Sequence, residues 1–304
     1  MKLRIAAAAA AGILLIGILA WPIASPQEPL GIVSQPGLRG GFVLIILAFF
    51  TGILGYFFSW PYGREIGILA VPAGLCVWAI RGGSIANVIQ QHPAIADRQA
   101  FYSALRWEPF FWLAVVGAGF LAVYLAHKLI PNSTQKESVP QEMERRGNLK
   151  SRHKPNVPVP QGVNVMIAVI GSIAIAHIFI SMFAQDVRLP DKWLGYVIAQ
   201  PAKGQIVFAV LAGFAAAAFV VKKFLDSSYV WPASASVLLM FYACFRYARP
   251  EILRYLAQEH PANFFSSALV CILPVQMVAL AAIGSVAGYW LAVRFNYWRE
   301  HEID

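Results

Sequence analysis

Two copies of one short pattern contain the residues of this chain with the widest chemical repertoire. In each copy an arginine follows a cysteine by five positions, and a His-Pro pair follows the arginine by eleven. Histidine can bind a metal or a haem and can transfer protons near neutral pH. Arginine can bind carboxylate or phosphate through two hydrogen bonds, and a cysteine thiolate is a nucleophile. The copies are Cys76, Arg81 and His92 in the first half of the chain, and Cys244, Arg249 and His260 in the second.

Each of these residue types also has a structural explanation. A histidine before a proline ends a helix, where it can interact with the last carbonyl groups and the helix dipole. An arginine at the end of a membrane helix extends to phosphate headgroups, and a cysteine five positions earlier lies on another helical face. No further histidine or carboxylate cluster stands at metal-ligand spacing. The sequence therefore predicts no metal site and no catalytic set, and it leaves any cofactor unknown.

Three further polar residues are candidates for binding a ligand or a protein partner. Gln35 and Gln200 each precede a proline in two similar loops, and His177 stands within a long apolar segment. Other ionisable residues near the apolar segments are few, namely His127 and Glu65. Because proton pumps use carboxylates inside the membrane, the expected lack of a buried Asp, Glu or Lys disfavours a proton-coupled pump.

The composition predicts that helices within a lipid bilayer position these residues. Of 304 residues, 59% are hydrophobic and 13% are charged, which is about half the usual charged share of soluble domains. A soluble protein of this composition would expose large apolar patches, whereas roughly 20 apolar residues in a helix span the hydrocarbon core. The last helix is expected to tilt or kink at Pro274. The apolar segments predict eight spanning helices, at residues 5–23, 42–60, 65–81, 110–130, 163–184, 205–221, 229–246 and 266–293.

The two halves of the chain contain matching motifs in the same order. The loop at 30–36 matches the loop at 194–201, and the two Cys-Arg-His-Pro patterns follow these loops. Gly119 and Tyr124 match Gly284 and Tyr289. The sequence therefore predicts a duplication. Because each half has an even number of helices, the repeats are expected to be parallel and related by a pseudo-twofold axis along the membrane normal.

The predicted organisation has three parts, which are a first four-helix repeat at 1–130, a basic flexible linker at 131–161 and a second four-helix repeat at 162–304 with a short tail. Lys and Arg number 14 on the linker side against 10 on the other side. This bias predicts a cytoplasmic linker and cytoplasmic termini in a bacterial inner membrane. The first helix also resembles a cleavable signal peptide, but its counterpart at 163–184 favours a retained helix.

Short interfacial helices are predicted on the opposite, extracytoplasmic side. Pro250 suits the first turn of a helix, and the residues after it place apolar side chains on one side and polar ones on the other. Residues 84–91 show a similar spacing. Such helices lie at the level of the lipid headgroups. The fold class is therefore an all-α polytopic membrane protein with eight spanning helices and short interfacial helices.

The net charge of +9 is best explained by loops that meet anionic lipid headgroups. No basic stripe with aromatic stacking platforms suggests a nucleic-acid partner. The expected partners are the bilayer, its anionic headgroups and, in a membrane complex, other proteins.

Three function classes are compatible with these features. The missing catalytic set favours a non-enzymatic structural or accessory subunit of a membrane complex. A small-solute transporter or channel would have its path between the two halves. A membrane enzyme or redox protein would use His92 and His260. Candidate residues for lining a transport path are Thr51, His177, Ser181, Ser234, Ser236 and Gln276.

Overall fold

The computed structural model describes most of the apolar segments and parts of the loops. The described residues are 2–24, 38–81, 85, 94–129, 161–184, 187–191, 195–199, 201–259, 265 and 267–301. All statements below concern these residues. The predicted linker at 131–161 and the predicted interfacial helix at 84–91 lie almost entirely outside them.

The first half of the chain contains four groups of helical segments. The first group is α1 (Lys2–Gly12), a π-helical stretch (Ile13–Leu19) and α2 (Trp21–Ala24), and the second is α3 (Leu38–Phe58). The third group is α4 (Gly63–Ile66), a 3₁₀ turn (Gly67–Leu69) and α5 (Ala70–Arg81). The fourth group is α7 (Ile95–Leu105) and α8 (Glu108–Leu129).

The helices of the second half begin after the predicted linker. They are α11 (Gln161–Phe183), α12 (Lys203–Leu225), α13 (Val230–Tyr247), α14 (Pro250–Glu259), a 3₁₀ turn (Ala268–Cys271) and α15 (Pro274–His301). The helix ends carry charges that suit the helix dipole, since α8 begins at Glu108 and ends beside Lys128, and α12 ends at Lys222 and Lys223.

Seven of the described helical segments are long and apolar enough to cross a membrane, which is consistent with an integral membrane protein. They match seven of the eight predicted spans. The eighth, α13, is helical where the sequence predicts a helix, but tryptophan, proline, serine, tyrosine and arginine lower its hydropathy. Within the membrane a helix satisfies its backbone hydrogen bonds internally, which explains why these apolar segments are helical.

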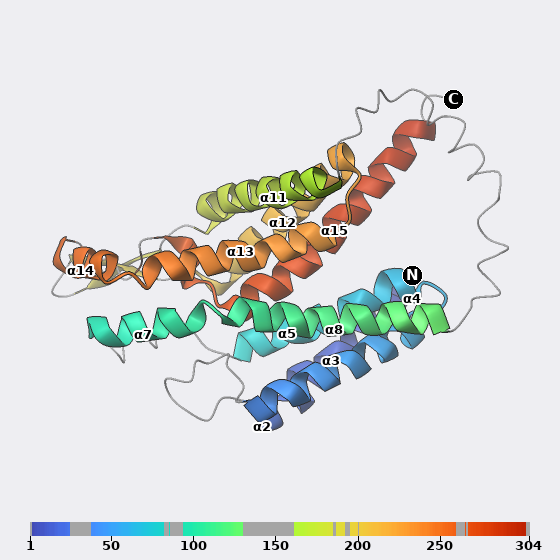
Figure 1. The fold of residues 1–304 in the computed structure, drawn as a ribbon, viewed down its shortest axis with the longest axis horizontal. Helices are drawn as coiled ribbons and strands as arrows, with labels where there is room; N and C mark the ends of the chain where they lie inside the picture. Colours follow the sequence, from blue (N-terminus) through green and yellow to red (C-terminus); the bar gives the residue numbers. More distant parts are fainter. Residues whose placement is uncertain are drawn as a thin grey trace.

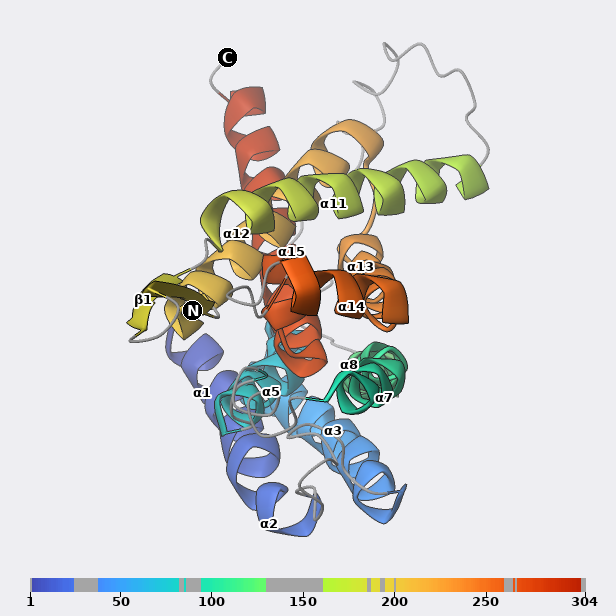
Figure 2. The same cartoon turned by 90° about the vertical axis from the view of Figure 1, so that its left-hand side faces the viewer.

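The long helices run side by side and leave two distinct ends (Figure 1). At one end, called the linker end here, lie the end of α8, the start of α11, the end of α15 and α4. At the other, called the hairpin end, lie α7 and α14. Figure 2 looks onto the hairpin end and shows α14 lying across it, with the helices of 2–129 grouped largely below those of 161–301.

Helix contacts follow the same pattern in each half and also join the halves. In the first half α3 packs on α8 and α1 on α5, and in the second half α12 packs on α15 and α11 on α13. Between the halves α5 contacts α15, α8 contacts α13, and α8 contacts α15. Large buried side chains such as Trp78, Trp112 and Phe214 fill the core.

Three elements differ from the expectations. The short helix α7 was not expected, because Asp97, Arg98 and Gln99 interrupt its apolar residues. A hairpin of β1 (Val187–Asp191) paired antiparallel with β2 (Gly195–Ala199) was not expected either, whereas the other described elements are helical. The expected kink at Pro274 is wrong, because Pro274 is the first residue of α15, where proline loses no helical hydrogen bond.

Candidate ligand-binding pocket at the linker end

The structure describes three of the seven residues predicted as binding candidates. Arg81 and Arg249 lie at the hairpin end with exposed side chains, and each guanidinium lies over an aromatic ring. The distances to the ring centroids are 5.8 Å for Arg81 over Trp21 and 5.5 Å for Arg249 over Phe245. The predictions for His92, His260, Gln35 and Gln200 fall outside the described residues.

The third described candidate, His177, lies on the outer face of α11. Its side chain is exposed, and it forms no hydrogen bond within the described part of the chain. Ser181, one turn further along α11, is also exposed and donates a hydrogen bond to the carbonyl oxygen of Ile178 at 2.8 Å. His177 lies six residues before the end of α11, about 9 Å along the axis at 1.5 Å per residue.

The three cysteines form no disulfide and are enclosed by the helices. Cys244 and Cys271 are buried, and Cys76 is half-buried. A reactive thiol needs an accessible, electropositive environment, which these positions do not provide. Their surroundings fit the structural explanation, in which cysteine packs as a small apolar side chain.

The expectation that no carboxylate is buried is wrong for Glu108. Its side chain is only 3% exposed and lies in the first turn of α8. A negative charge is favoured there by the helix dipole. The sequence prediction failed because Glu108 stands at the boundary of an apolar segment, where exposure is the usual outcome.

Buried aromatic side chains surround this part of the hairpin end. The ring centroids of Trp78 and Trp112 are 6.2 Å apart, and those of Tyr102 and Tyr247 are 5.1 Å apart. The Nε1 atoms of both tryptophans and the hydroxyl of Tyr102 are buried without a hydrogen-bond partner among the described residues. The rings pack against one another, so we assign them to the core.

A cavity of about 690 Å³ lies at the linker end, between the two halves. Its volume is within the range of small-molecule sites, which is roughly 300–1,000 Å³. The first half contributes residues from the turn before α4, from α4, from the 3₁₀ turn after it and from α8. The second half contributes residues from the α12–α13 turn and from α15. The lining residues are Pro61, Tyr62, Arg64, Glu65, Ile68, His127, Ser228, Tyr229, Tyr289, Trp290, Val293, Arg294 and Tyr297.

Two glycines bring the α4 side of the pocket close to α3. A Cβ atom on Gly63 would lie 2.5 Å from the ring of Tyr56, and one on Gly67 would lie 2.9 Å from the backbone nitrogen of Tyr56. A larger residue at either position would push this segment away from α3. The absence of side chains at 63 and 67 therefore fixes the position of Arg64 and Glu65, which stand between them.

An aromatic row forms the wall that belongs to the second half. The ring centroids of Tyr229 and Tyr289 are 5.5 Å apart. The ring of Phe120, from α8 of the first half, extends this row, with its centroid 6.0 Å from that of Tyr229. The Nζ atom of Lys222 lies 5.0 Å from the ring centroid of Tyr289. Tyr229 and Trp290 also pack against a buried apolar cluster that includes Ile68, Val123 and Val286.

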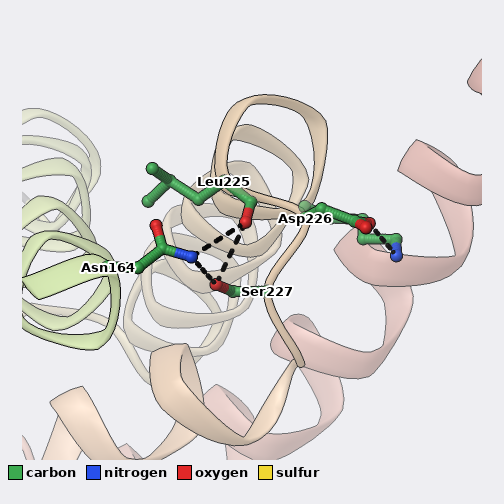
Figure 3. A network of polar contacts seen from close by, with 5 residues as sticks. Asn164, Leu225, Asp226 and Ser227 are labelled. Atoms are coloured by element: carbon green, nitrogen blue, oxygen red, sulfur yellow. Dashed lines mark hydrogen bonds and ion pairs between the residues drawn. The ribbon is translucent and has the colours of Figure 1, made fainter. Parts of the chain in front are cut away.

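A small polar network holds the turn that carries Ser228 and Tyr229 (Figure 3). The Nδ2 atom of Asn164, near the start of α11, donates hydrogen bonds to the carbonyl oxygen of Leu225 at 3.2 Å and to Oγ of Ser227 at 3.4 Å. On the same turn Lys222 and Asp226 form an ion pair at 2.5 Å. The start of α11 is thereby attached to one wall of the pocket.

The charges of the pocket are predominantly positive. Arg64 and Arg294 come from different halves, and neither forms an ion pair within the described residues. Glu65 is the single carboxylate among the lining residues. The guanidinium of Arg294 lies 4.6 Å from the ring centroid of Trp298, and that of Arg4 lies 5.6 Å from the ring of Tyr62.

Burial affects two of the lining side chains, His127 and Tyr229. The Nδ1 atom of His127 is buried and has no hydrogen-bond partner among the described residues. Burial raises the pKa of Tyr229, in the turn before α13, above its usual value, although the positive charge of Arg64 acts in the opposite direction. Arg64 and Tyr229 come from different halves and line the same cavity. The described residues contain no cluster of His, Cys, Asp or Glu suited to a metal ion.

Sequence reasoning did not identify this pocket. Its residues come from four separate segments, and no fixed spacing connects them. One signal was present, since each segment combines aromatic residues with arginine, histidine or lysine at the end of an apolar run. That signal alone is also typical of the ordinary aromatic belt at a membrane surface. No family model matches this chain, and no curated protein or solved structure matches it either.

Proposed function

We propose that this chain is a non-enzymatic structural or accessory subunit of a membrane complex, and that the outer face of α11 contacts a partner subunit. The observation that supports this proposal is His177. A polar side chain that faces lipid lacks hydrogen-bond partners and is costly there, whereas a neighbouring helix can supply a partner. Of the seven candidate spans, α11 has the smallest buried share, 22%. A helix from another subunit would cover both His177 and this apolar face.

The packing of the bundle also favours a supporting role. The hydroxyls of Thr51 and Ser236 are buried and donate to carbonyl oxygens of their own helices, those of Leu47 at 2.7 Å and Ala233 at 2.6 Å. The helix α15 also serves packing, since 72% of its candidate span is buried within the bundle. These hydroxyls are already satisfied, and they line no cavity identified in the described residues.

The proposed scaffold consists of two parallel four-helix repeats, with α13 as the eighth span and the linker as a connection between the repeats. The exchanged contacts α5–α15 and α8–α13 support a pseudo-twofold axis. Glycine positions support it too. A Cβ atom on Gly284 would lie 2.5 Å from the carbonyl oxygen of Leu211 in α12. A Cβ atom on its sequence counterpart Gly119 would lie 3.5 Å from the carbonyl oxygen of Ala48 in α3 and 2.4 Å from Cγ2 of Val71 in α5. We further propose that the linker end is cytoplasmic, in a bacterial inner membrane.

Native mass spectrometry tests the subunit proposal. The tagged full-length chain is purified from its own membrane in mild detergent, and stoichiometric protein partners are expected in the spectrum. The variant His177→Leu is expected to lose these partners, because it cannot form the hydrogen bond. Ser234→Leu is the matched control, since it also replaces a polar residue outside the buried core of a helix and should retain them. A wild-type chain that appears alone, or only as a homo-oligomer, would contradict the proposal.

A transporter or channel is the second candidate, because the pocket lies between the halves, where such a path is expected. This candidate requires a residue at the centre of the bundle to become accessible from each side in turn. Ser285 is suitable, since it is fully buried and its hydroxyl has no partner among the described residues. In a transporter, a cysteine at 285 would react with membrane-impermeant reagents from both sides. The structural role predicts no reaction from either side.

A further inference from the structure

We infer that the pocket at the linker end binds the phosphate group of an anionic ligand. Two arginines, Arg64 and Arg294, line one cavity, and Glu65 is the single carboxylate among the lining residues. Guanidinium groups bind phosphate through paired, charge-assisted hydrogen bonds. This inference is independent of the subunit proposal and concerns another part of the molecule.

His127 is a further titratable side chain at the border of this cavity, besides the arginines and Glu65. Buried polar atoms normally have hydrogen-bond partners, and an exception requires an explanation. Nδ1 of His127 has no partner among the described residues, and the side chain borders the cavity. Because Nδ1 has almost no accessible surface, a ligand in the cavity would meet another part of the imidazole ring rather than this atom. The nearest ring contact, with Tyr56 at 6.3 Å between centroids, does not satisfy it.

The shape and the aromatic lining fit a ligand with both polar and apolar parts. The cavity is bordered by Tyr62, Tyr229, Tyr289 and Trp290, and two of these rings pack against a buried apolar cluster. Tyrosine and tryptophan prefer the boundary between lipid and water, where one edge is apolar and the other is hydrated. The same phosphate chemistry could be presented by a lipid headgroup or by a soluble phosphate.

Arginine that only extends toward the bulk headgroup layer would have a different arrangement. Such residues need only an apolar surface for their stems and water for their charges, and they do not require a shared cavity. Here the arginines come from helices that are distant in sequence, and the charge of Arg64 influences Tyr229 on the opposite wall. Both arginine side chains are exposed, and the shared cavity is what brings them within reach of one ligand.

Lipid titration monitored by native mass spectrometry tests this inference on the purified, delipidated full-length chain. Phosphatidylglycerol is the anionic probe and phosphatidylcholine is the zwitterionic reference. The wild type is expected to bind one phosphatidylglycerol in preference. The double variant Arg64→Gln/Arg294→Gln is expected to bind it about tenfold to a hundredfold more weakly, as for lost charge-assisted hydrogen bonds. Arg249→Gln, an exposed arginine over an aromatic ring at the other end, is the matched control and should bind as the wild type does.

A third arm with inorganic phosphate identifies the source of the phosphate group. Displacement of the lipid at millimolar concentrations, or binding of phosphate alone that depends on both arginines, indicates a soluble ligand. Selective lipid binding that phosphate does not affect indicates a headgroup. Equal binding of both lipids by the wild type, with no effect of phosphate, would overturn the inference.

A second variant keeps the test decisive if the double variant does not fold, which thermal unfolding would reveal. Ser228→Trp fills the cavity from its exposed rim and leaves every charge unchanged. The inference requires this variant to lose the selective binding, and unchanged binding would refute it. Because this assay uses the isolated chain, its result does not depend on whether partner subunits exist.

Discussion

At the scale of single residues, a few polar side chains of this protein hold a turn between apolar helices. Asn164 is the clearest case, since one amide group donates to both a helix-terminal carbonyl and a serine hydroxyl of the α12–α13 turn. In the largely apolar surroundings, these bonds replace hydration that the turn would otherwise need. The same turn continues into Ser228 and Tyr229, so the side chain of Asn164 contributes indirectly to the pocket.

Replacing Asn164 by aspartate is expected to destabilise the protein more than replacing it by alanine. Alanine removes the two hydrogen bonds, at a cost of about 1–2 kcal/mol. Aspartate in addition places a negative charge beside the carbonyl of Leu225 at the negative end of the α12 dipole. Thermal unfolding in detergent measures the difference. Gln161→Glu, which adds the same charge at an exposed position of α11, should leave the unfolding temperature nearly unchanged, and a larger loss for Asn164→Ala would contradict this explanation.

Residue identity alone predicted little of the candidate site. Histidine, arginine and cysteine stand out in a sequence this apolar, and the repeated pattern drew attention to the hairpin end. The residues of the pocket do not stand out in this way, because arginine and tyrosine are common at the ends of membrane helices. Only the packing of α4 against α3 and of α8 against α15 brings Arg64, His127 and Arg294 to one cavity. Such proximity depends on helix contacts, which carry no signal in local spacing.

At the scale of helices, close backbone approach through glycine determines which helices pair within each half. Gly284 and Gly288 of α15 stand against the backbone of α12, so closely that a Cβ atom on either would overlap backbone atoms of Leu211 or Ala215. Small residues allow such approach in membranes, where dispersion contacts drive helix association. The tight α12–α15 pair thus depends on two positions one turn apart.

The substitution Gly284→Ala is expected to lower the free energy of unfolding by about 1–3 kcal/mol, because the added methyl group forces the two helices apart. Gly171→Ala in α11 is the matched control, since no atom lies within 4 Å of the added Cβ. That change should be neutral or stabilising by up to about 1 kcal/mol, as alanine is the better helix former. Thermal or denaturant unfolding of both variants in one detergent distinguishes them. Equal stability of the two variants would argue against the tight pair.

The helices themselves were largely predictable, because length and hydropathy together determine which segments can cross a bilayer. The amphipathic helix at Pro250–Glu259 was also predicted, and in the structure Leu253 and Leu256 are buried while Glu251 and Arg254 are exposed. The hairpin was not predicted, since its five-residue strands include Pro190 and show no strict alternation. Elements this short depend on contacts with the rest of the chain more than on their own sequence.

At the scale of the whole molecule, the proposed even number of spans in each half would place both termini and the linker on one side of the membrane. This prediction can be checked with single cysteines in a cysteine-free background, at Gly147 in the linker, Lys192 in the hairpin and Glu302 in the tail. Membrane-impermeant maleimide should label positions 147 and 302 from one side and position 192 from the other. Labelling of 302 from the same side as 192 would mean that one helix, with α13 as the first suspect, does not span.

The two halves are expected to assemble when they are expressed as separate chains. Helix contacts hold each half together, and the contacts of α5 and α8 with α15 and α13 join the halves without the linker. Residues 1–145 and 146–304, expressed together, should co-purify and show an unfolding temperature within a few degrees of the intact chain. The loss of translational and rotational entropy on association of the two pieces is smaller when both are confined to one membrane. Failure of the pieces to co-purify, although both insert into the membrane, would show that the linker is required for assembly.

A single four-helix half would leave the inner sides of its third and fourth helices uncovered, since α5 and α8 make their outward contacts with α15 and α13. If the halves descend from one gene, the ancestral protein would therefore have been a homodimer, with its twofold axis between the copies. Fusion of two such genes would have released each side of the interface from the requirement to match the other. Tyr124 and Tyr289 illustrate this divergence, because only Tyr289 lines the pocket while its counterpart is 56% exposed.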